Sequence, residues 1–254
     1  MQMQEERSMH SDVCVVIPVR LQSERFPNKP LCLYKGKTLI HNVIEIATKL
    51  HFVDRIVVAC SEDSREVQLI CEEYQIDFLH VAENVSCGTE KVYYVHQLFP
   101  MHSYYMTIPV DEPSLDPAEL NHVFSNYCDK PFTIATLFTE FFCEEDLLDE
   151  KSCKIVTFAN SWKILYTSRA VIPAKKDGTL HELCFYKKHV GVFLFPAITA
   201  NTKQFWHKTL LSSLEGLEQN MFLEYNFQGF KINHKGFGID VKEQISRLEE
   251  RMSH

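Results

Sequence analysis

Hydrophobic and polar positions alternate along the first half of the chain in two rhythms, one typical of buried strands and one of amphipathic helices. Short, nearly continuous apolar runs predict strands, and apolar residues spaced three and four apart predict helices. In chain order these patterns predict a strand at 13–17, a helix at 39–50 capped by Thr38, a strand at 55–60, a helix at 63–74, a strand at 76–81, a helix at 89–98 and a strand at 104–109. Short connections between such strands predict an α/β fold with a doubly wound, mostly parallel sheet and right-handed crossovers.

The second half is less regular. Its patterns predict strands at 132–138, 154–158, 162–167, 185–195 and 229–232, an acidic helix or loop at 144–150, and helices at 214–225 and 241–252. The three middle strands follow one another directly, which favours antiparallel pairing. We therefore predict a disordered lead at 1–12 and one domain at 13–254, in which 132–213 form a smaller inserted lobe with mixed antiparallel strands.

A polar loop with three cations follows the first strand. Arg20, Arg25 and Lys29 leave the same strand end together, between Pro18 and Pro30. Arginine offers a planar fork of donors and lysine a point charge, and open α/β sheets bind ligands beyond the carboxyl ends of their strands. The loop therefore suits a polyphosphate, although a solvated basic loop explains the composition equally well.

Two aspartates are expected near the same edge of the sheet, one after a predicted strand and one before a predicted helix. Asp111 comes after the strand at 104–109, and Asp240 stands just before the last helix. Paired carboxylates that face phosphates are a common way of holding Mg²⁺. Asp240 has an alternative role as the N-cap of the closing helix.

Composition and charge restrict the classes of function. The net charge of −8 argues against a general nucleic-acid surface but leaves room for a small anionic ligand at a local group of cations. The apolar runs are too short to span a bilayer, and the first residues lack the pattern of a signal peptide. Nine cysteines without a CxxC pair predict reduced thiols in a cytoplasmic protein.

Eight ordered segments carry a family resemblance. They are IPVRLQSERFPNKPL at 17–31, GKTLIHNVIEIA at 36–47, VSCGTEK at 85–91, VDEPSLDP at 110–117, LYTSRAVIP at 165–173, KKHVGVFLF at 187–195, SSLEGLE at 212–218 and GFGIDVKEQISRLEE at 236–250. In order and spacing these segments resemble the 3-deoxy-manno-octulosonate cytidylyltransferases, or CMP-Kdo synthetases. The resemblance implies a nucleotide-diphospho-sugar transferase-like fold, a homodimer, and the Mg²⁺-dependent conversion of CTP and an acidic sugar into a CMP-sugar and pyrophosphate.

The resemblance also implies roles for individual residues. By position, Arg20, Arg25 and Lys29 bind the CTP triphosphate, and Gly88 and Thr89 belong to the nucleotide pocket. Asp111 and Asp240 fall on the metal ligands, and Arg20, Lys29 and Asp111 carry the catalysis. Arg169, His189 and Glu215 fall in the acceptor-sugar region. The implied mechanism is a single in-line displacement at the α-phosphorus without a covalent protein intermediate.

Several positions depart from the family pattern. Asn28 replaces a glycine of the basic loop and is expected to adopt its left-handed conformation. Pro109 and Val110 replace a Gln-Gly pair, and Cys87 and Lys91 replace a serine and an arginine. Where the family typically reads LEQLR, we align the block after Glu218, so that a Glu-Gln pair becomes Met221-Phe222 and an arginine becomes Glu224. These changes predict a less polar or differently substituted acidic acceptor.

Three functions therefore compete. The first is transfer of CMP to 3-deoxy-manno-octulosonate, and the second is transfer to another ulosonic acid or a phosphonate. The third is a non-catalytic homologue that binds a nucleotide or a protein partner, although four retained charges at one edge count against it. A homodimer also gains modest support from the apolar segment that contains Phe185 and five apolar residues at 190 and 192–195, which offers more surface than a small lobe readily hides.

Overall fold

The computed structural model describes residues 12–253, except 24, 82–84, 86, 129, 131, 159 and 160. Apart from Asp12, the predicted disordered lead lies outside the described residues.

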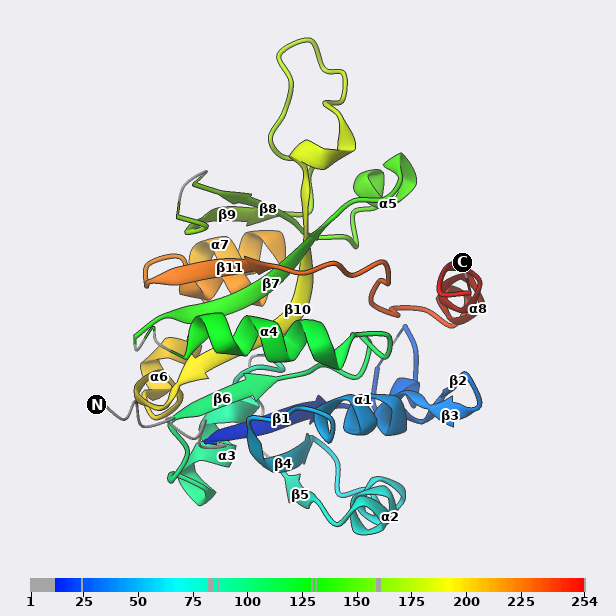
Figure 1. Cartoon of the computed structure of the whole chain (residues 1–254), viewed down its shortest axis with the longest axis vertical. Helices are drawn as coiled ribbons and strands as arrows, with labels where there is room; N and C mark the ends of the chain where they lie inside the picture. Colours follow the sequence, from blue (N-terminus) through cyan, green and yellow to red (C-terminus); the bar gives the residue numbers. More distant parts are fainter. Residues whose placement is uncertain are drawn as a thin grey trace, which may run out of the picture.

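A nine-stranded sheet forms the middle of the molecule (Figure 1). Its main path runs in the order β11-β7-β10-β6-β1-β4-β5, and β8 and β9 branch from β10. The strands are β1 (Val13–Val19), β4 (Val53–Cys60), β5 (Asp77–His80), β6 (Tyr104–Thr107), β7 (Ile134–Glu140), β8 (Lys154–Thr157), β9 (Ile164–Ser168), β10 (Lys187–Pro196) and β11 (Phe227–Lys231). β1 pairs in parallel with β4 and β6, whereas β10 runs antiparallel to β6 and β7. The predicted parallel half and antiparallel strands are both present.

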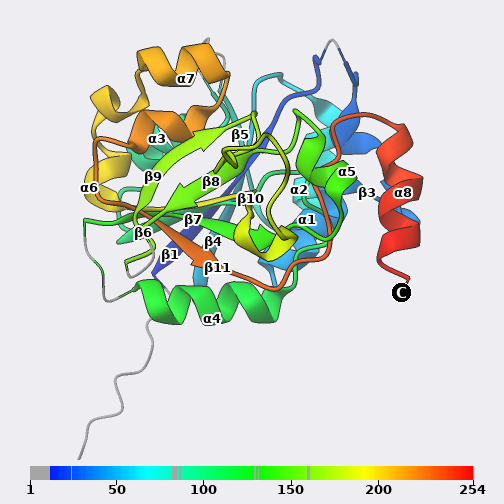
Figure 2. The same ribbon diagram turned by 90° about the horizontal axis from the view of Figure 1, so that it is seen from above.

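Helices cover both faces of the sheet, which makes three layers (Figures 1 and 2). One face packs against α1 (Leu39–Ala47), α2 (Arg65–Tyr74) and α4 (Pro117–Tyr127), and the other against α3 (Lys91–Leu98), α6 (Ala197–Ala200) and the 3₁₀ turn Glu218–Phe222. The remaining helices are α5 (Glu144–Leu148), α7 (Leu210–Glu215) and α8 (Glu243–Arg251), and a short hairpin joins β2 (Leu33–Tyr34) to β3 (Lys37–Thr38). β1 is buried along its length because both of its faces carry a helix layer.

Local signals in the sequence set several element ends. The Thr38 hydroxyl accepts the amide of His41 and caps α1, as predicted, and the Asp116 carboxylate accepts the amide of Ala118 at 2.9 Å to cap α4. The predicted cap at Asp240 is wrong, because Lys242 is the N-cap of α8. The side chain of Gln244 instead accepts the amides of Asp240 and Val241.

The predicted helix at 214–225 is also wrong. α7 begins at Leu210 and ends at Glu215, and Gly216 adopts the left-handed conformation with φ 63°. A 3₁₀ turn at Glu218–Phe222 follows. A glycine at this position ends a helix readily because it has no Cβ to clash in the left-handed conformation.

The range 132–213, predicted as an inserted lobe, divides between two environments. β7 and β10 lie in the middle of the sheet, whereas β8 and β9 branch from it. Residues 170–186 form an arm that extends from the body of the molecule (Figure 1). Of the apolar residues taken as support for a homodimer, Phe185 is exposed, but those at 190 and 192–195 are buried in the core of the single chain. These five residues therefore offer no surface for a homodimer, because they lie on a central strand.

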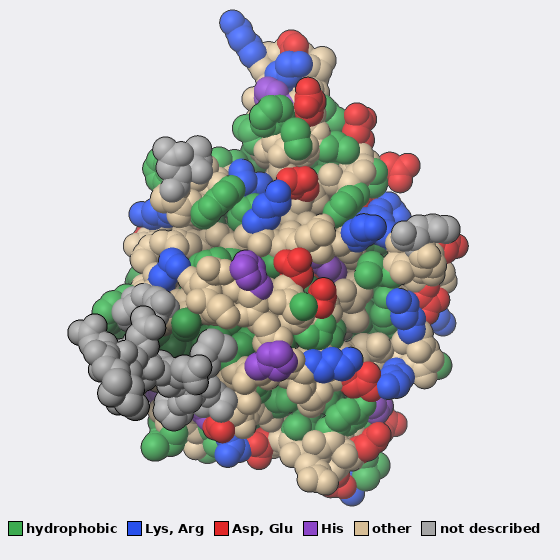
Figure 3. Space-filling view, viewed as in Figure 1, with side chains coloured by type: hydrophobic (Ala, Val, Ile, Leu, Met, Phe, Trp, Pro, Cys, Tyr) green, Lys and Arg blue, Asp and Glu red, His purple; other side chains and the backbone are tan. Residues whose placement is uncertain are grey.

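The surface bears charges of both signs. Acidic and basic side chains are interspersed on the face shown in Figure 3. Among the described residues, no helix combines the length and the apolar character needed to cross a membrane.

Candidate active site

The candidate site lies where the direction of the sheet connections reverses. The chain passes from β1 to β4 and β5 and then returns to β6 on the other side of β1. Such reversals open a crevice at the carboxyl ends of the strands. A cavity of about 330 Å³ lies at this point, lined by residues that end β1 and by the loop that follows β6.

This first cavity collects most of the residues predicted to bind the nucleotide. Arg20, Lys29, Gly88, Thr89 and Asp111 all line it. Arg25 lines an adjoining cavity, together with Arg20 and Gly88. The tertiary structure thus brings together segments that are far apart in the sequence.

Asn28 shapes the loop that presents Lys29. It has φ 55° and ψ 25°, which confirms the left-handed conformation expected where the family has glycine. Its amide donates to the carbonyl of Leu21 at 2.9 Å, so the loop closes on itself. The next residue, Lys29, then turns inward.

Lys29 joins two loops at the centre of the site. Its Nζ lies 3.0 Å from Oδ2 of Asp111 and donates to the carbonyl of Ile239 at 2.9 Å. The Ile239 amide donates in turn to the carbonyl of Asp111 at 2.9 Å. These contacts hold the two segments that carry Asp111 and Asp240 side by side.

Asp111 and Asp240 fit a divalent cation. Desolvation raises the pKa of Asp240, and the negative charge of Asp111 raises it further. A cation would remove this repulsion, and Mg²⁺ typically takes one or two protein carboxylates and completes its shell with phosphate oxygens and water. In the described part of the chain no three His, Cys, Asp or Glu side chains are grouped to hold a metal, so the other ligands would come from substrate and water.

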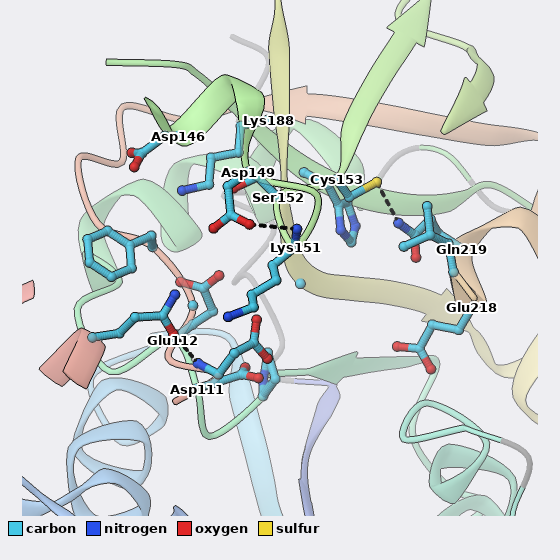
Figure 4. Close-up of a pocket in the computed structure, with 18 of the residues that line it drawn as sticks. Asp111, Glu112, Asp146, Asp149, Lys151, Ser152, Cys153, Lys188, Glu218 and Gln219 are labelled. Atoms are coloured by element: carbon cyan, nitrogen blue, oxygen red, sulfur yellow. Dashed lines mark hydrogen bonds between the residues drawn. The ribbon is translucent and has the colours of Figure 1, made fainter. Parts of the chain in front are cut away.

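A second cavity of about 250 Å³ lies on the other side of Asp111 (Figure 4). Asp240, His189, Lys188 and Gln219 are among its lining residues. The two cavities share Pro109, Asp111, Gly191 and Glu218, so they form one cleft with Asp111 at its middle.

Glu218 stands in the wall between the two cavities. Its Oε2 accepts the hydroxyl of Thr89 at 3.1 Å and the Thr89 amide at 3.4 Å. Desolvation raises the pKa of Glu218, and the charge of Asp111 acts in the same direction. Glu218 therefore ties the predicted nucleotide segment to the second cavity.

His189 enters the second cavity as a neutral side chain. Burial lowers its pKa to about 4. Its Nε2 lies 2.8 Å from the hydroxyl of Thr136, which is itself bonded to the carbonyl of Val192. Because the Thr136 hydroxyl donates to Val192, Nε2 donates to Thr136. The neutral imidazole is held in one orientation with Nδ1 as a hydrogen-bond acceptor.

Arg169 and Glu215 line neither cavity, although both were predicted in the acceptor region. The Arg169 guanidinium donates to the carbonyls of Glu215 at 2.8 Å, Glu150 at 3.0 Å and Gly216 at 3.1 Å. The Glu215 carboxylate accepts from Tyr166, Ser168 and the Arg169 amide. The pair lies behind the cleft and clamps the loops that carry residues 151–153 and 217–219.

A Glu-Gln pair lines the second cavity, while the replacement of the family's pair by Met221 and Phe222 stays a prediction. The chain reads Leu-Glu-Gln at 217–219, and both Glu218 and Gln219 line the second cavity. Phe222 is fully buried in the core and Met221 is 2% exposed, and neither side chain lines the first or the second cavity.

Other residues of the second cavity were not singled out from the sequence. Lys151 and Cys153 lie outside the segments that carry the resemblance, and Lys188 lies in one of them without an assigned role. The three meet through the pairing of β8 with β10 and the loop before β8. The cavity is charged and polar, which counts against a less polar acceptor. Gln219 Nε2 lies 2.9 Å from the sulfur of Cys153, and burial raises the pKa of that thiol to about 11.

Comparisons with known proteins agree with this geometry. The sequence model of a family described as cytidylyltransferase matches residues 14–235. The 3-deoxy-manno-octulosonate cytidylyltransferase of Aliivibrio salmonicida is 31% identical over 249 residues, which cover 92% of this chain and 96% of the relative. The chain belongs to the 3-deoxy-manno-octulosonate cytidylyltransferase family.

Members of this family from distant organisms are similar over nearly the whole chain. The mitochondrial 3-deoxy-manno-octulosonate cytidylyltransferase of Arabidopsis thaliana is 27% identical over 249 residues, with 97% of this chain and 85% of the relative covered. A solved structure of CMP:2-keto-3-deoxy-manno-octonic acid synthetase complexed with CTP shares the fold with a TM-score of 0.83 at 23% identity, over 95% of this chain and 98% of that one. The inositol-1-phosphate CTP transferase from T. maritima shares it more loosely, with a TM-score of 0.64 at 16% identity and 95% of each chain covered.

Proposed function

We propose that this cytidylyltransferase transfers CMP from CTP to 3-deoxy-manno-octulosonate and releases pyrophosphate. The observation that carries the proposal is the single cleft with Asp111 at its middle, bounded by cations on one side and by a polar cavity on the other. CTP occupies the side of Arg20, Lys29 and Thr89, and the sugar acid occupies the side of His189 and Gln219. The family assignment supports both the CTP side and the sugar-acid side of this arrangement.

The reaction is an in-line displacement. A hydroxyl oxygen of the acceptor attacks the α-phosphorus, the bond from that phosphorus to the bridging oxygen of the β-phosphate breaks, and pyrophosphate leaves while the hydroxyl proton is lost to solvent. Arg20 and Lys29 stabilise the charge that grows on the phosphate oxygens. Positioning both reactants in one cleft removes much of the entropic barrier.

Mg²⁺ is part of this proposal. Asp111 and Asp240 would hold it, and it would supply charge neutralisation at the phosphates. Lys29 orients Asp111 through their hydrogen bond. A metal requirement is tested by adding EDTA and then restoring Mg²⁺ in measured steps.

A second acceptor is favoured by one observation. Pro109 lines both cavities where the family has a glutamine that can donate hydrogen bonds. Loss of that side chain would relax the requirement for one hydroxyl of the acceptor. Another ulosonic acid or a phosphonate is therefore the alternative substrate.

The test is pyrophosphate release from CTP and Mg²⁺ with a panel of acceptors. The panel holds 3-deoxy-manno-octulosonate, its 8-amino analogue, neuraminic acid and simple phosphonates, and Asp111→Ala is the control. Release with 3-deoxy-manno-octulosonate that the control abolishes supports the proposal, and release with another acceptor alone favours the alternative. Silence with every acceptor, together with no thermal shift by CTP, favours a non-catalytic homologue.

We also propose a homodimer and a cytoplasmic location. Phe158, Trp162, Leu165 and Phe185, which lie on or near β8, β9 and the arm, are large apolar residues with exposed side chains and support a pairing surface there. All nine cysteines lie among the described residues and none of them forms a disulfide, which is compatible with a reducing compartment. Sedimentation equilibrium tests the dimer, and Trp162→Ser is expected to weaken it.

A further inference from the structure

Lys188 is a buried cation in the wall of the acceptor cavity. It lies on β10, its side chain is 7% exposed, and it lines the cavity together with His189 and Gln219. Figure 4 shows it near Asp146 and Asp149, on the side of the cavity away from Glu218. A charged group so deep in the protein is costly unless it has a partner of opposite charge.

No carboxylate of the described residues forms an ion pair with Lys188 within 4.0 Å. Its Nζ donates one long hydrogen bond, of 3.5 Å, to the carbonyl of Gly236. An ammonium group has three donors, so most of its capacity is unused.

The carboxylates that face Lys188 are bonded to other side chains. Asp146 binds Arg247 through Oδ1 at 2.9 Å and Arg251 through Oδ2. Glu112 lies 3.2 Å from Nε2 of His234 through Oε2. Desolvation lowers the pKa of Lys188, and the more distant charges of Glu112 and Asp146 only partly oppose it.

Three cations surround one aromatic ring at this end of the cavity. Lys188 Nζ lies 5.5 Å from the centroid of Phe237, and the guanidinium carbons of Arg247 and Arg251 lie at 5.6 Å and 4.7 Å. Asp146 balances the two arginines only in part. An anion brought into the cavity at Lys188 would therefore meet a positive potential and relieve repulsion among like charges.

We infer that Lys188 binds the carboxylate of the sugar acid and makes the enzyme select acidic acceptors. This inference rests on the proposed function. The resemblance placed Arg169 in the acceptor-sugar region, but Arg169 does not line the cavity. The guanidinium of Arg169 is bonded to three backbone carbonyls, and that of Arg247 is bonded to Asp146. Lys151 also lines the cavity, but it is exposed and its charge acts on Asp240.

The experiment compares Lys188→Met, Lys188→Arg and Lys187→Met. Lys187 is the matched control, because it is the neighbouring lysine on β10 but lies outside the cavity, over the rings of Phe138 and Trp162. Each variant is assayed with 3-deoxy-manno-octulosonate and with its C1 amide, which keeps the shape but lacks the charge. Calorimetry of both ligands, with and without CTP and with EDTA to prevent turnover, measures binding independently of the reaction.

We expect Lys188→Met to raise the KM for the acid by about 10- to 100-fold, the usual effect of losing a charge-assisted hydrogen bond. The KM for CTP should be unchanged and the melting temperature should not fall, because methionine fills the same space and removes a buried charge without a partner. Lys188→Arg should recover most of the affinity, and Lys187→Met should behave as wild type. Wild type should prefer the acid to the amide, and Lys188→Met should lose that preference.

The inference is overturned if Lys188→Met still prefers the acid to the amide, or if Lys187→Met weakens acceptor binding equally. It is separable from the proposed function. Wild-type turnover with an unaffected Lys188→Met would overturn only the inference. Binding of the acid that depends on Lys188, without any pyrophosphate release, would support the inference and overturn the proposed function. Failure of the acid to bind wild type by either measurement would overturn both.

Discussion

The amine of Lys29 lies 3.0 Å from the carboxylate of Asp111, 82 positions further along the chain. The same amine also reaches the carbonyl of Ile239, so one side chain connects the loop after β1, the loop after β6 and the segment before α8. This contact gives Lys29 a structural role in addition to its attraction for phosphate. It sets the position of the carboxylates on which the proposed chemistry depends.

Replacing Lys29 with methionine should therefore reduce catalysis by more than the loss of nucleotide affinity alone would explain. We expect kcat/KM for CTP to fall about 10²- to 10³-fold, as for other residues that stabilise developing charge. Lys29→Arg restores the positive charge and should recover part of the activity, but it should not restore the alignment of Asp111. Steady-state pyrophosphate release measures the effect, and Lys49→Met, at an exposed position on the surface, is the control. Equal losses in the two methionine variants would count against this role.

The interaction between Asp111 and Asp240 predicts a pH dependence. Because the pKa of Asp240 is raised in the folded protein, this carboxyl stays protonated to a higher pH than a free aspartate and then binds a cation poorly. The Mg²⁺ concentration for half-maximal activity should rise as the pH falls through that raised pKa. In Asp111→Asn the pKa of Asp240 should move down toward its ordinary value, which the carboxyl ¹³C chemical shift of Asp240 can follow. An unchanged titration in Asp111→Asn would show that the two carboxyl groups do not interact.

Glu218→Gln should separate stability from activity. Desolvation raises the pKa of Glu218, so its ionised form is less favourable in the folded than in the unfolded protein. A carboxyl with a raised pKa reduces stability as the pH rises above its unfolded value, and the neutral amide removes that cost. Glu218→Gln should therefore melt higher than wild type at neutral pH, with the difference shrinking toward acidic pH.

The same substitution should reduce activity by about tenfold or more, because a charge-assisted acceptor for Thr89 is lost. Calorimetric melting at several pH values and the pyrophosphate assay are the two measurements. Thr89→Val is the companion variant, since it removes the hydroxyl from the other side of the contact. A stability difference that does not change with pH would contradict the assigned cause.

Arg169→Met tests whether Arg169 binds the acceptor or clamps the loops behind the cleft. The loss of three bonds to backbone carbonyls should lower the free energy of unfolding by about 2 kcal/mol or more. The KM for the acceptor should rise because the loops with residues 151–153 and 217–219 loosen. The preference for the acid over its C1 amide should survive, in contrast to Lys188→Met. Urea unfolding and the two-ligand assay make the distinction, and loss of the preference would show that Arg169 itself contributes to recognition of the acid.

The sequence alone determined the elements whose signals are local. The helix cap at Thr38 and the left-handed conformation at Asn28 depend on a residue and its near neighbours. The order of the first strands and helices follows from hydrophobic periodicity, which acts over a few turns. The same reasoning failed at Leu214 to Tyr225, because one glycine ended a pattern that otherwise continued at helical spacing.

The tertiary structure alone decided which side chains share a site. Glu218 meets Thr89 across 129 positions, and Arg169 turns its guanidinium to backbone carbonyls that no spacing in the sequence indicates. In the sequence Lys188 is one of two adjacent lysines, but of the two only Lys188 lines the cavity. The physical reason is that local patterns fix backbone conformation through short-range forces, whereas the partners of a buried charge depend on how the strands are ordered in the sheet.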